Sequence, residues 1–532
     1  MSNQTSQSNV TNAQPKKLSA AQSKRLAARV QAKRQKMIDE FFDRLFLLGG
    51  MITATDTYKR TMGHAFRDFA MKPAAYHLTM RKGVGEPGAG NQLIQAGHEA
   101  MLAQWFRKPL KRADILLARD FAHNNSKVPY FPTEMWEALL ADQKGSQNIH
   151  LPVDVWGFPG GQTFLAGVPS MTFEGQYGGV LSYLEPRMCN YFQPVIQATK
   201  GRLMDIATKG RFAEFGLRTA LEANHLVMLL ALFVGAGGKR ILTSNDTAEL
   251  MWPEMFYAIG TFGHEGMSSN QRLDRNLSDC ELEMMIAALK AVPNARVLTD
   301  LIDAETVGLE NFIKALKAVP EASEAGPRVD SGDIAKQCAM YYQRMVEEGI
   351  VPRLTVYEDE VNPEKCVEVD RIFTETTGAE PTKLFPGAGG YFWRGVHRDT
   401  VAAVFKRSES DGNPNMKFSN SPGKASIPGN VRVYGKGDVM YIADVSEVVD
   451  GESLFVQLVK DGRIVYNESY VDQGKRAEAT WGKYTRFELS PLLQSHIDTY
   501  NGMRAHERAA YFANHTEQAN PAATEEKTPV KA

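Results

Sequence analysis

Between about residues 209 and 406, short β-like segments alternate with helical stretches, and this alternation restricts the fold more than any other feature of the chain. Each β-like segment ends in glycine and polar or charged residues. Repeated strand, loop and helix units imply parallel strands with helical crossovers, because parallel strands cannot be joined by a tight turn. About six such units predict an irregular, closed or partly closed α/β barrel with its site at the C-terminal strand ends. A doubly wound open sheet is the alternative.

The individual segments of this region follow from apolar patterning. The expected strands begin near Ile241, Met255, Ala295, Arg328, Arg353 and Lys383. Helices are expected over residues 281–291, 311–319 and 334–348, where apolar residues recur at helical spacing. Pro293 and Asn294 end the first of these helices, since proline cannot continue the hydrogen-bond ladder.

The two flanks of this region have a different pattern. Residues 39–200 mix helices with Gly- and Pro-rich loops, whereas residues after about Val431 are rich in β-like segments. We expect both flanks to pack together as one α+β domain beside the barrel. The predicted boundaries are 1–38 for a disordered basic tail, 39–200 for the N-terminal part of the flanking domain, 201–410 for the barrel, 411–515 for the C-terminal β-rich part, and 516–532 for a second disordered tail.

The charge and cysteine content exclude several classes of partner and site. Lys and Arg number 61 and Asp and Glu 62, so no global charge recruits nucleic acid or a membrane. The longest apolar run, residues 226–234, is far shorter than the roughly 20 residues that span a bilayer. The 4 cysteines are widely spaced and lack CxxC pairing, which argues against a disulfide framework or a zinc site. We expect a cytoplasmic protein.

The N-terminal residues 1–38 contain basic residues but no acidic residue. We expect a solvated tail, because the segment lacks the apolar core of a secretory signal. An organelle-targeting segment and a nucleic-acid-contacting arm are the alternatives.

Residues 259–265 carry the first candidate catalytic group. An apolar run stops at Gly260, and Thr261 and a second glycine lead to His264 beside Glu265. An imidazole in such a loop can act as acid, base or nucleophile near neutral pH, and Glu265 can tune its basicity. A single histidine after a strand is also often a hydrogen-bonded structural residue, so the interpretation depends on the loops that follow.

The densest polar cluster is the loop of Arg328, Asp330, Ser331, Gly332 and Asp333. It lies where a strand ends and a helix begins, and a helix N-terminus offers unpaired N–H groups. Such a loop can hold a charged substrate and a hydroxylated sugar together. The alternative is that Ser331 or Asp333 only caps the helix that begins near residue 334.

Residues 387–390, Gly-Ala-Gly-Gly, form a glycine-rich loop that would let backbone amides approach phosphate oxygens, although no Walker lysine follows. The downstream cations available to a phosphate or diphosphate are Arg394, Arg398 and Lys406. Asp300 and Asp303 could hold ribose hydroxyls or water around magnesium, although loop solvation explains Asp303 equally well. Together these loops suit a phosphorylated sugar substrate better than a hydrolase triad.

Taken in chain order, these motifs resemble those of the nicotinate phosphoribosyltransferases and, slightly less closely, those of the related nicotinamide phosphoribosyltransferases. The matching segments are Thr55-Asp56-Thr57-Tyr58, Phe173-Glu174-Gly175, Leu184-Glu185-Pro186, Phe215-Gly216-Leu217-Arg218, Thr243-Ser244-Asn245, the loop from Gly260 to Glu265, the loop from Arg328 to Asp333, and Lys417-Phe418-Ser419 through Lys424 to Pro428-Gly429. The resemblance implies the type II phosphoribosyltransferase fold, an irregular α/β barrel with a second α+β domain built from both chain ends, usually working as a homodimer.

The resemblance also implies a reaction. Nicotinate and phosphoribosyl diphosphate would give nicotinate mononucleotide and diphosphate in NAD biosynthesis or salvage, with Mg2+ present and ATP hydrolysis coupled through a transient phosphohistidine at His264. The implied catalytic residues are His264, Asp330 and Glu265. The implied substrate-binding residues are Tyr58, Phe215, Arg218, Asn245, Asp246, Thr261, Asp300, Arg328, Ser331, Asp333, Gly387, Gly389, Gly390 and Arg398. Tyr58 would reach the base across a dimer interface, and Phe215 would stack on the ring.

Three departures from the family pattern stand out. The segment 300–303 lacks the usual tyrosine, and Tyr357-Glu358-Asp359-Glu360 replaces the usual Ser-Asn-Asp or Gly-Asp-Gly, which affects the expected phosphate or magnesium site. Asp246 resembles the acid with which nicotinamide enzymes hold a carboxamide, whereas Asp333 favours nicotinate. The alternatives are therefore a nicotinamide phosphoribosyltransferase and a non-catalytic nucleotide-binding regulator. A magnesium-dependent phosphohydrolase would have no special use for His264 and Arg328.

Overall fold

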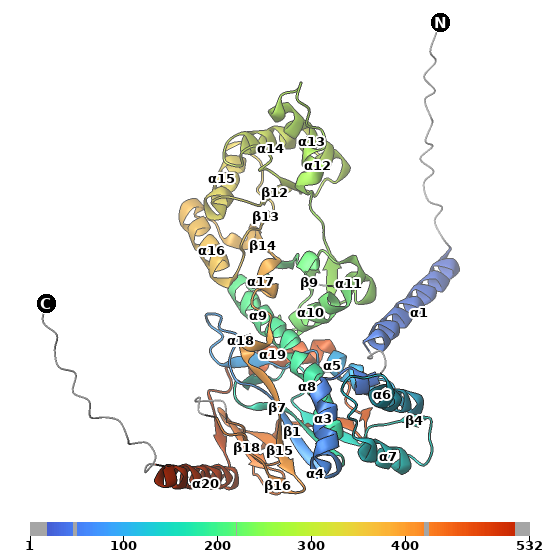
Figure 1. Cartoon of the computed structure of the whole chain (residues 1–532). Helices are drawn as coiled ribbons and strands as arrows, with labels where there is room; N and C mark the ends of the chain where they lie inside the picture. Colours follow the sequence, from blue (N-terminus) through green and yellow to red (C-terminus); the bar gives the residue numbers. More distant parts are fainter. Residues whose placement is uncertain (1–18, 46–49, 220, 420–424, 516–532) are drawn as a thin grey trace, which may run out of the picture.

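The computed structural model describes residues 19–45, 50–219, 221–419 and 425–515 (Figure 1). The second expected tail, residues 516–532, and Lys424 lie outside these ranges. None of the helices in the described ranges has the length and apolar character that a membrane crossing requires. The fold has two parts, a curled parallel sheet with helices around it and a larger α+β domain (Figure 1).

Seven parallel strands form the curled sheet. In sheet order they are β10 (Phe256–Ala258), β9 (Ile241–Thr243), β8 (Ala213–Glu214), β14 (Leu384–Ala388), β13 (Thr355–Tyr357), β12 (Gly326–Val329) and β11 (Arg296–Leu298). Followed around the curl, from β8 through β14, this is chain order, and the sheet is open between β10 and β11. A doubly wound sheet instead reverses its order at a switch point. The predicted irregular barrel is confirmed, in the form of a half-barrel, and the doubly wound alternative is wrong.

Helices connect the strands of the half-barrel. They are α10 (Glu222–Gly235), α11 (Asp246–Met251), α12 (His264–Ser268), α13 (Leu277–Ala291), α14 (Val307–Ala318), α15 (Ile334–Glu347) and α16 (Pro363–Thr377), followed by the short α17 (Gly390–Trp393) and α18 (Arg398–Val401). The expected helices at 281–291 and 311–319 begin earlier than predicted. For α13 the reason is a cap, because the Asn276 side chain accepts hydrogen bonds from the N–H groups of Ser278 and Asp279.

The second domain is built around a seven-stranded sheet that takes strands from both sides of the barrel. Its order is β16 (Asn413–Pro414), β15 (Ala403–Ser410), β1 (Ala74–Met80), β7 (Pro169–Gly175), β5 (Val153–Gly157), β20 (Val456–Lys460) and β21 (Arg463–Ile464). The central strand β1 pairs antiparallel with β15 on one side and β7 on the other. The predicted domain built from both chain ends is therefore confirmed.

Smaller elements complete this domain. Before the barrel they are α2 (Gly50–Thr53), α3 (Thr57–Ala65), α4 (Arg67–Met71), β2 (Gln92–Ile94), α5 (His98–Phe106), β3 (Leu110–Lys111), α6 (Arg112–Asn124), α7 (Thr133–Asp142), β4 (Asn148–Ile149), β6 (Thr163–Leu165), α8 (Gly178–Met188) and α9 (Phe192–Thr208). After it they are β17 (Val431–Lys436), β18 (Val439–Asp444), β19 (Glu452–Ser453), α19 (Tyr470–Thr480), β22 (Arg486–Leu489) and α20 (Pro491–His515). The C-terminal part, expected to be β-rich, therefore also contains two helices.

Helix α1 (Ala20–Arg44) corrects one expectation, because residues 20–38 were assigned to a disordered tail. The Ser19 side chain accepts from the Gln22 backbone, and the Gln22 side chain accepts from the Ser19 backbone, which forms a capping box. The helix is rich in Ala, Lys, Arg and Gln, which have high helix propensity. Phe41 is buried, and Met37, Ile38 and Phe42 pack partly buried against the core, so the apolar contacts described for this helix lie at its C-terminal end. Figure 1 shows α1 extending away from the rest of the fold.

Helices α9 and α10 pack at close range where the second domain meets the half-barrel. A Cβ atom on Gly235 would lie 1.9 Å from the carbonyl oxygen of Ala198, and one on Gly201 would lie 3.0 Å from that of Leu232. The two backbones can approach this closely because glycine has no side chain.

Substituting Gly235→Ala is expected to lower the free energy of unfolding by about 1–3 kcal/mol, because the added methyl group forces the two helices apart. Thermal unfolding followed by circular dichroism would measure this as a lower melting temperature. The matched control is Gly502→Ala in α20, where an added Cβ meets no atom within 4 Å. A wild-type melting temperature for Gly235→Ala would contradict the close helix contact.

Candidate functional site

His264 lies at the open edge of the half-barrel, as the first residue of α12 after β10. Its Nε2 is 2.8 Å from Asp300 Oδ1, and its Nδ1 is 3.7 Å from Asp330 Oδ2. Asp300 follows β11 and Asp330 follows β12, so the imidazole reaches across the gap between β10 and β11. The ring remains 48% exposed, which leaves it accessible to a ligand.

Arg328, on β12, is the central cation of the strand ends. Its Nη1 donates to Thr261 Oγ1 at 2.7 Å and to the carbonyl oxygen of Phe262 at 3.3 Å. Its Nη2 donates to Asp330 Oδ2 at 3.2 Å and to Glu358 Oε2 at 3.0 Å, and Nε lies 2.9 Å from Glu358 Oε1. One guanidinium thus joins the loops that follow β10, β12 and β13.

The loop after β12 divides its polar residues between the site and the helix that follows. Ser331 Oγ donates to Asp300 Oδ2 at 2.7 Å, so Ser331 belongs to the carboxylate cluster. Asp333 instead caps α15, since its Oδ1 accepts from the backbone N–H of Lys336 at 3.1 Å. Gly332, at φ +82°, makes the turn between them. The capping alternative therefore describes the observed contact of Asp333 but not that of Ser331.

Burial and mutual repulsion perturb two carboxyl groups of the cluster. Burial raises the pKa of Asp330, and the charge of Asp300 adds to this, while Arg328 and His264 oppose it. Burial also raises the pKa of Glu358 to about 7, against the opposing attraction of Arg328. The Glu358 carboxyl group therefore changes its charge near neutral pH. The sequence analysis of its loop did not predict this.

Phe215 follows β8 and packs against the glycine-rich segment at the C-terminal end of β14. A Cβ on Gly387 would lie 2.6 Å from the Phe215 ring and 2.9 Å from Glu358 Cγ, and one on Gly389 would lie 2.9 Å from the Phe215 carbonyl oxygen. These two glycines thus make room for Phe215, whereas a Cβ on Gly390 would meet no atom within 4 Å. Arg218 is exposed, and its charge lowers the pKa of Glu358, so it also faces the cluster.

A buried network beside Phe215 joins the predicted Asn245 to Glu214 and His225, which the sequence analysis did not single out. Glu214 Oε1 accepts from the backbone N–H of Gly216 at 2.6 Å and lies 3.1 Å from His225 Nε2. Thr243 Oγ1 donates to Glu214 Oε2 at 3.1 Å, and Asn245 Nδ2 lies 3.0 Å from His225 Nδ1. Asn245 also caps α11, so both ends of its amide are used within the protein. An acid inside an apolar strand and a histidine beside the apolar run of α10 were the available signals.

Four further predicted site residues are exposed. Tyr58, half exposed on α3, donates to Glu185 Oε2 at 3.3 Å in the second domain. Arg398, at the start of α18, pairs with the neighbouring Asp399 at 2.8 Å. Asp246 and Glu265 are exposed. The carboxylate that contacts the His264 imidazole is that of Asp300, so the contact does not support Glu265 as the residue that tunes its basicity.

Within the described ranges, no group of three or more His, Cys, Asp and Glu side chains is placed to hold a metal ion. Magnesium is often held instead through one or two carboxylates and the phosphates of a substrate, and Asp300 and Asp330 would suit that arrangement.

Comparisons with known proteins were made for the sequence and for the fold. No model of a known protein family matches the sequence. The nicotinate phosphoribosyltransferase of Cronobacter sakazakii is 27% identical over 232 residues, which cover 42% of this chain and 52% of that protein. The match thus spans about half the length of that relative.

Two solved structures have similar folds over most of the chain. Human nicotinic acid phosphoribosyltransferase aligns with a TM-score of 0.61 and 18% identity, covering 84% of this chain and 99% of that chain. Nicotinate-nucleotide pyrophosphorylase of Pyrococcus furiosus aligns with a TM-score of 0.55 and 15% identity, covering 81% and 95%. The resemblance to the nicotinate phosphoribosyltransferases is therefore confirmed, and this chain has the fold of that family.

Proposed function

We propose that this protein is a nicotinate phosphoribosyltransferase, which forms nicotinate mononucleotide and diphosphate from nicotinate and phosphoribosyl diphosphate. The observation that carries the proposal is the cluster of His264, Asp300, Arg328 and Asp330 at the open edge of the half-barrel. The sequence relationship to the Cronobacter sakazakii protein supports the same reaction. Strand C-terminal ends are where half-barrels and barrels of this kind place their chemistry.

The anionic groups of the substrates would bind to arginine side chains, and the pyridine ring would bind to the Phe215 ring. Arg218 and Arg328 would bind the nicotinate carboxylate and the sugar-phosphate side, because guanidinium groups match both kinds of anion. Phe215 would stack on the pyridine ring. Magnesium would enter with the diphosphate and neutralise part of its charge beside Asp300 and Asp330.

ATP hydrolysis would be coupled through His264. The Asp300 carboxylate, 2.8 Å from Nε2, favours the tautomer with its proton on Nε2 and its lone pair on Nδ1. Nδ1 would attack the γ-phosphorus of ATP, the bond to the bridging oxygen would break, and ADP would leave. A phosphorylated imidazole adds negative charge beside Asp330 and would reorganise the pocket that receives the diphosphate.

The assembly would be a homodimer in which Tyr58 reaches a neighbouring subunit's site, since its own α3 lies in the second domain and leaves it half exposed. Asp246 is exposed at the start of α11. Its carboxylate would attract the amide N–H of nicotinamide and repel the carboxylate of nicotinate, so nicotinamide is the alternative base.

A product assay with phosphoribosyl diphosphate, Mg2+ and ATP, offering each base separately, tests the proposed reaction. Nicotinate mononucleotide with ADP release is the expected result. Nicotinamide mononucleotide alone would assign specificity to Asp246 instead. No product from either base would contradict catalysis and favour a nucleotide-binding regulator.

His264→Ala is expected to abolish ATP-stimulated product formation without changing the fold, because it removes the phosphoryl acceptor. The measurement is the ratio of ADP released to mononucleotide formed, together with a circular dichroism spectrum. Gln271→Ala, an exposed residue shortly after α12, is the matched control and should behave as wild type. Unchanged ATP coupling in His264→Ala would rule out the phosphohistidine.

Glu358→Gln is expected to make diphosphate binding less dependent on pH. Above the pKa of about 7, the Glu358 carboxylate is charged, occupies Arg328 and repels an incoming anion, whereas below it the neutral acid releases the guanidinium. Wild-type affinity for inorganic diphosphate should therefore fall as pH rises from 6 to 8 relative to the variant. At pH 8 the variant should bind about tenfold tighter, or roughly 1.4 kcal/mol.

Titration calorimetry of both proteins at each pH provides the measurement. The ionisation of diphosphate itself cancels in the comparison because both proteins receive the same ligand. Parallel pH profiles for wild type and Glu358→Gln would contradict the role of Glu358.

A further inference from the structure

Four buried polar side chains beside Phe215 form a continuous hydrogen-bond network, called the Glu214 network below. They are Glu214 on β8, His225 on α10, Thr243 on β9 and Asn245 just before α11, and each is at most 2% exposed. Buried polar groups are stable only with partners, so the bonds within such a network fix the direction of each donor and acceptor.

The helix cap of α11 determines where His225 carries its proton. Asn245 Oδ1 accepts from the backbone N–H groups of Thr247 and Ala248. The Nδ2 amino group is therefore the end of Asn245 that lies 3.0 Å from His225 Nδ1. An amide N–H can only donate, so Nδ1 accepts and carries no proton. The imidazole proton is then on Nε2, which donates to Glu214 Oε1 at 3.1 Å.

Glu214 also holds the loop that carries Phe215. Its Oε1 accepts from the backbone N–H of Gly216 at 2.6 Å. The Gly216 carbonyl oxygen accepts from the Thr219 N–H at 2.9 Å, which closes a short 3-10 turn with Arg218 at its centre. The peptide groups on both sides of Gly216 are therefore fixed, with Phe215 before them and Arg218 after them.

The loop also has little free space around Gly216. A Cβ on Gly216 would lie 2.5 Å from Glu214 Oε1 and 2.6 Å from Trp393 Nε1. Trp393 belongs to α17, and its ring lies nearly parallel to that of His225, with 6.1 Å between the centroids and an angle of 14° between the planes. The Glu214 network and α17 thus enclose the backbone of this loop.

We propose, on the basis of the reaction proposed above, that His225 and Glu214 are positioning residues for the pyridine base. The Nε2–H of His225 fixes the Glu214 carboxylate, and the carboxylate fixes Gly216, so Phe215 and Arg218 meet the ring and its carboxylate from one rigid loop. Because both positioning residues are buried, they act through this loop and do not touch a substrate.

The Glu214 network is separate from the residues proposed for the diphosphate. Within the described ranges, no hydrogen bond joins its four side chains to Arg328, Asp300 or Asp330. Breaking the network is therefore expected to weaken the binding of nicotinate and to leave the binding of phosphoribosyl diphosphate unchanged. A general loss of structure would weaken both.

His225→Phe tests this difference, because phenylalanine keeps a flat ring beside Trp393 but lacks both nitrogens. Initial rates measured with each substrate varied in turn give the two KM values. The KM for nicotinate should rise about fivefold or more, as expected for the loss of a buried hydrogen bond, and that for phosphoribosyl diphosphate should stay within about twofold of wild type. His225→Gln, whose amide has one donating and one accepting end, should recover part of the loss.

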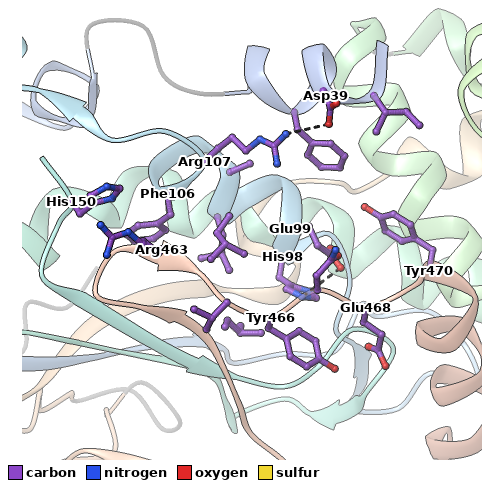
Figure 2. Close-up of a pocket in the computed structure, with 18 residues that line it drawn as sticks. Asp39, His98, Glu99, Phe106, Arg107, His150, Arg463, Tyr466, Glu468 and Tyr470 are labelled. Atoms are coloured by element: carbon purple, nitrogen blue, oxygen red, sulfur yellow. Dashed lines mark hydrogen bonds and ion pairs between the residues drawn. The ribbon is translucent and has the colours of Figure 1, made fainter. Parts of the chain in front are cut away.

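His98→Phe is the matched control, since it makes the same change at a buried histidine of the second domain. His98 is 2% exposed and begins α5. Figure 2 shows it next to Glu99 at a cavity of about 600 Å3, whose lining shares no residue with the Glu214 network. Both KM values of this variant should match wild type. Thermal unfolding of the two Phe variants measures any loss of stability separately from KM.

A second pair of variants decides the question if His225→Phe does not fold. Thr243 Oγ1 donates to Glu214 Oε2 at 3.1 Å. Thr243→Val removes this bond but keeps the side-chain shape, whereas Thr243→Ser retains the hydroxyl group. The valine variant should raise the KM for nicotinate alone, and the serine variant should raise it less.

Equal rises in both KM values would overturn the positioning role, because they would indicate a purely structural network. An unchanged KM for nicotinate in the folded His225→Phe or Thr243→Val variants would overturn it as well. A wild-type protein that forms no product would instead overturn the proposed reaction, and the positioning role with it.

Discussion

The arrangement of the strand ends depends on the buried charge of Arg328. Its side chain is only 13% exposed, so it requires acceptors from the protein, and it finds them on loops after three different strands. The dependence is mutual, because Asp330 and Glu358 are themselves largely buried and need a cation nearby. The contact with Thr261 also fixes the loop that carries His264, at the point where the sheet is open. The ion-pair network around Arg328 thus joins the loops after β10, β12 and β13 beside the place where the sheet is open.

The open barrel is tied to the second domain by the chain that enters and leaves it. Strand β1 precedes the barrel and β15 follows it, and the two pair directly, so the ends of the inserted barrel are brought together. Helix α9 leads from this domain into the barrel and packs closely on α10. Movement of the barrel against the second domain would have to disturb the close helix contact at Gly235. The pairing of β1 with β15 lies within the second domain and holds the two chain connections to the barrel near one another.

The sequence predicted the half-barrel and most of its strand-end residues, because apolar segments that stop at polar loops are a local signal. Contacts set by tertiary packing were less predictable. Asp300 rather than Glu265 meets His264, since the loops after β10 and β11 converge although they are distant along the chain. Helix α1 was missed because it forms through propensity and a capping box with little burial.

The segment after β13, which departs from the family pattern, has an unusual backbone conformation. Asp359 and Glu360 follow Glu358 with φ values of +69° and +48°, in the left-handed region that residues with a Cβ rarely adopt. Such a conformation persists only when the surroundings hold it. Here the Lys365 side chain donates to the Asp359 carbonyl oxygen at 3.0 Å, while Glu358 is fixed on Arg328. The left-handed backbone thus accompanies a carboxyl group placed on the central cation, and these two contacts explain how the loop holds its conformation.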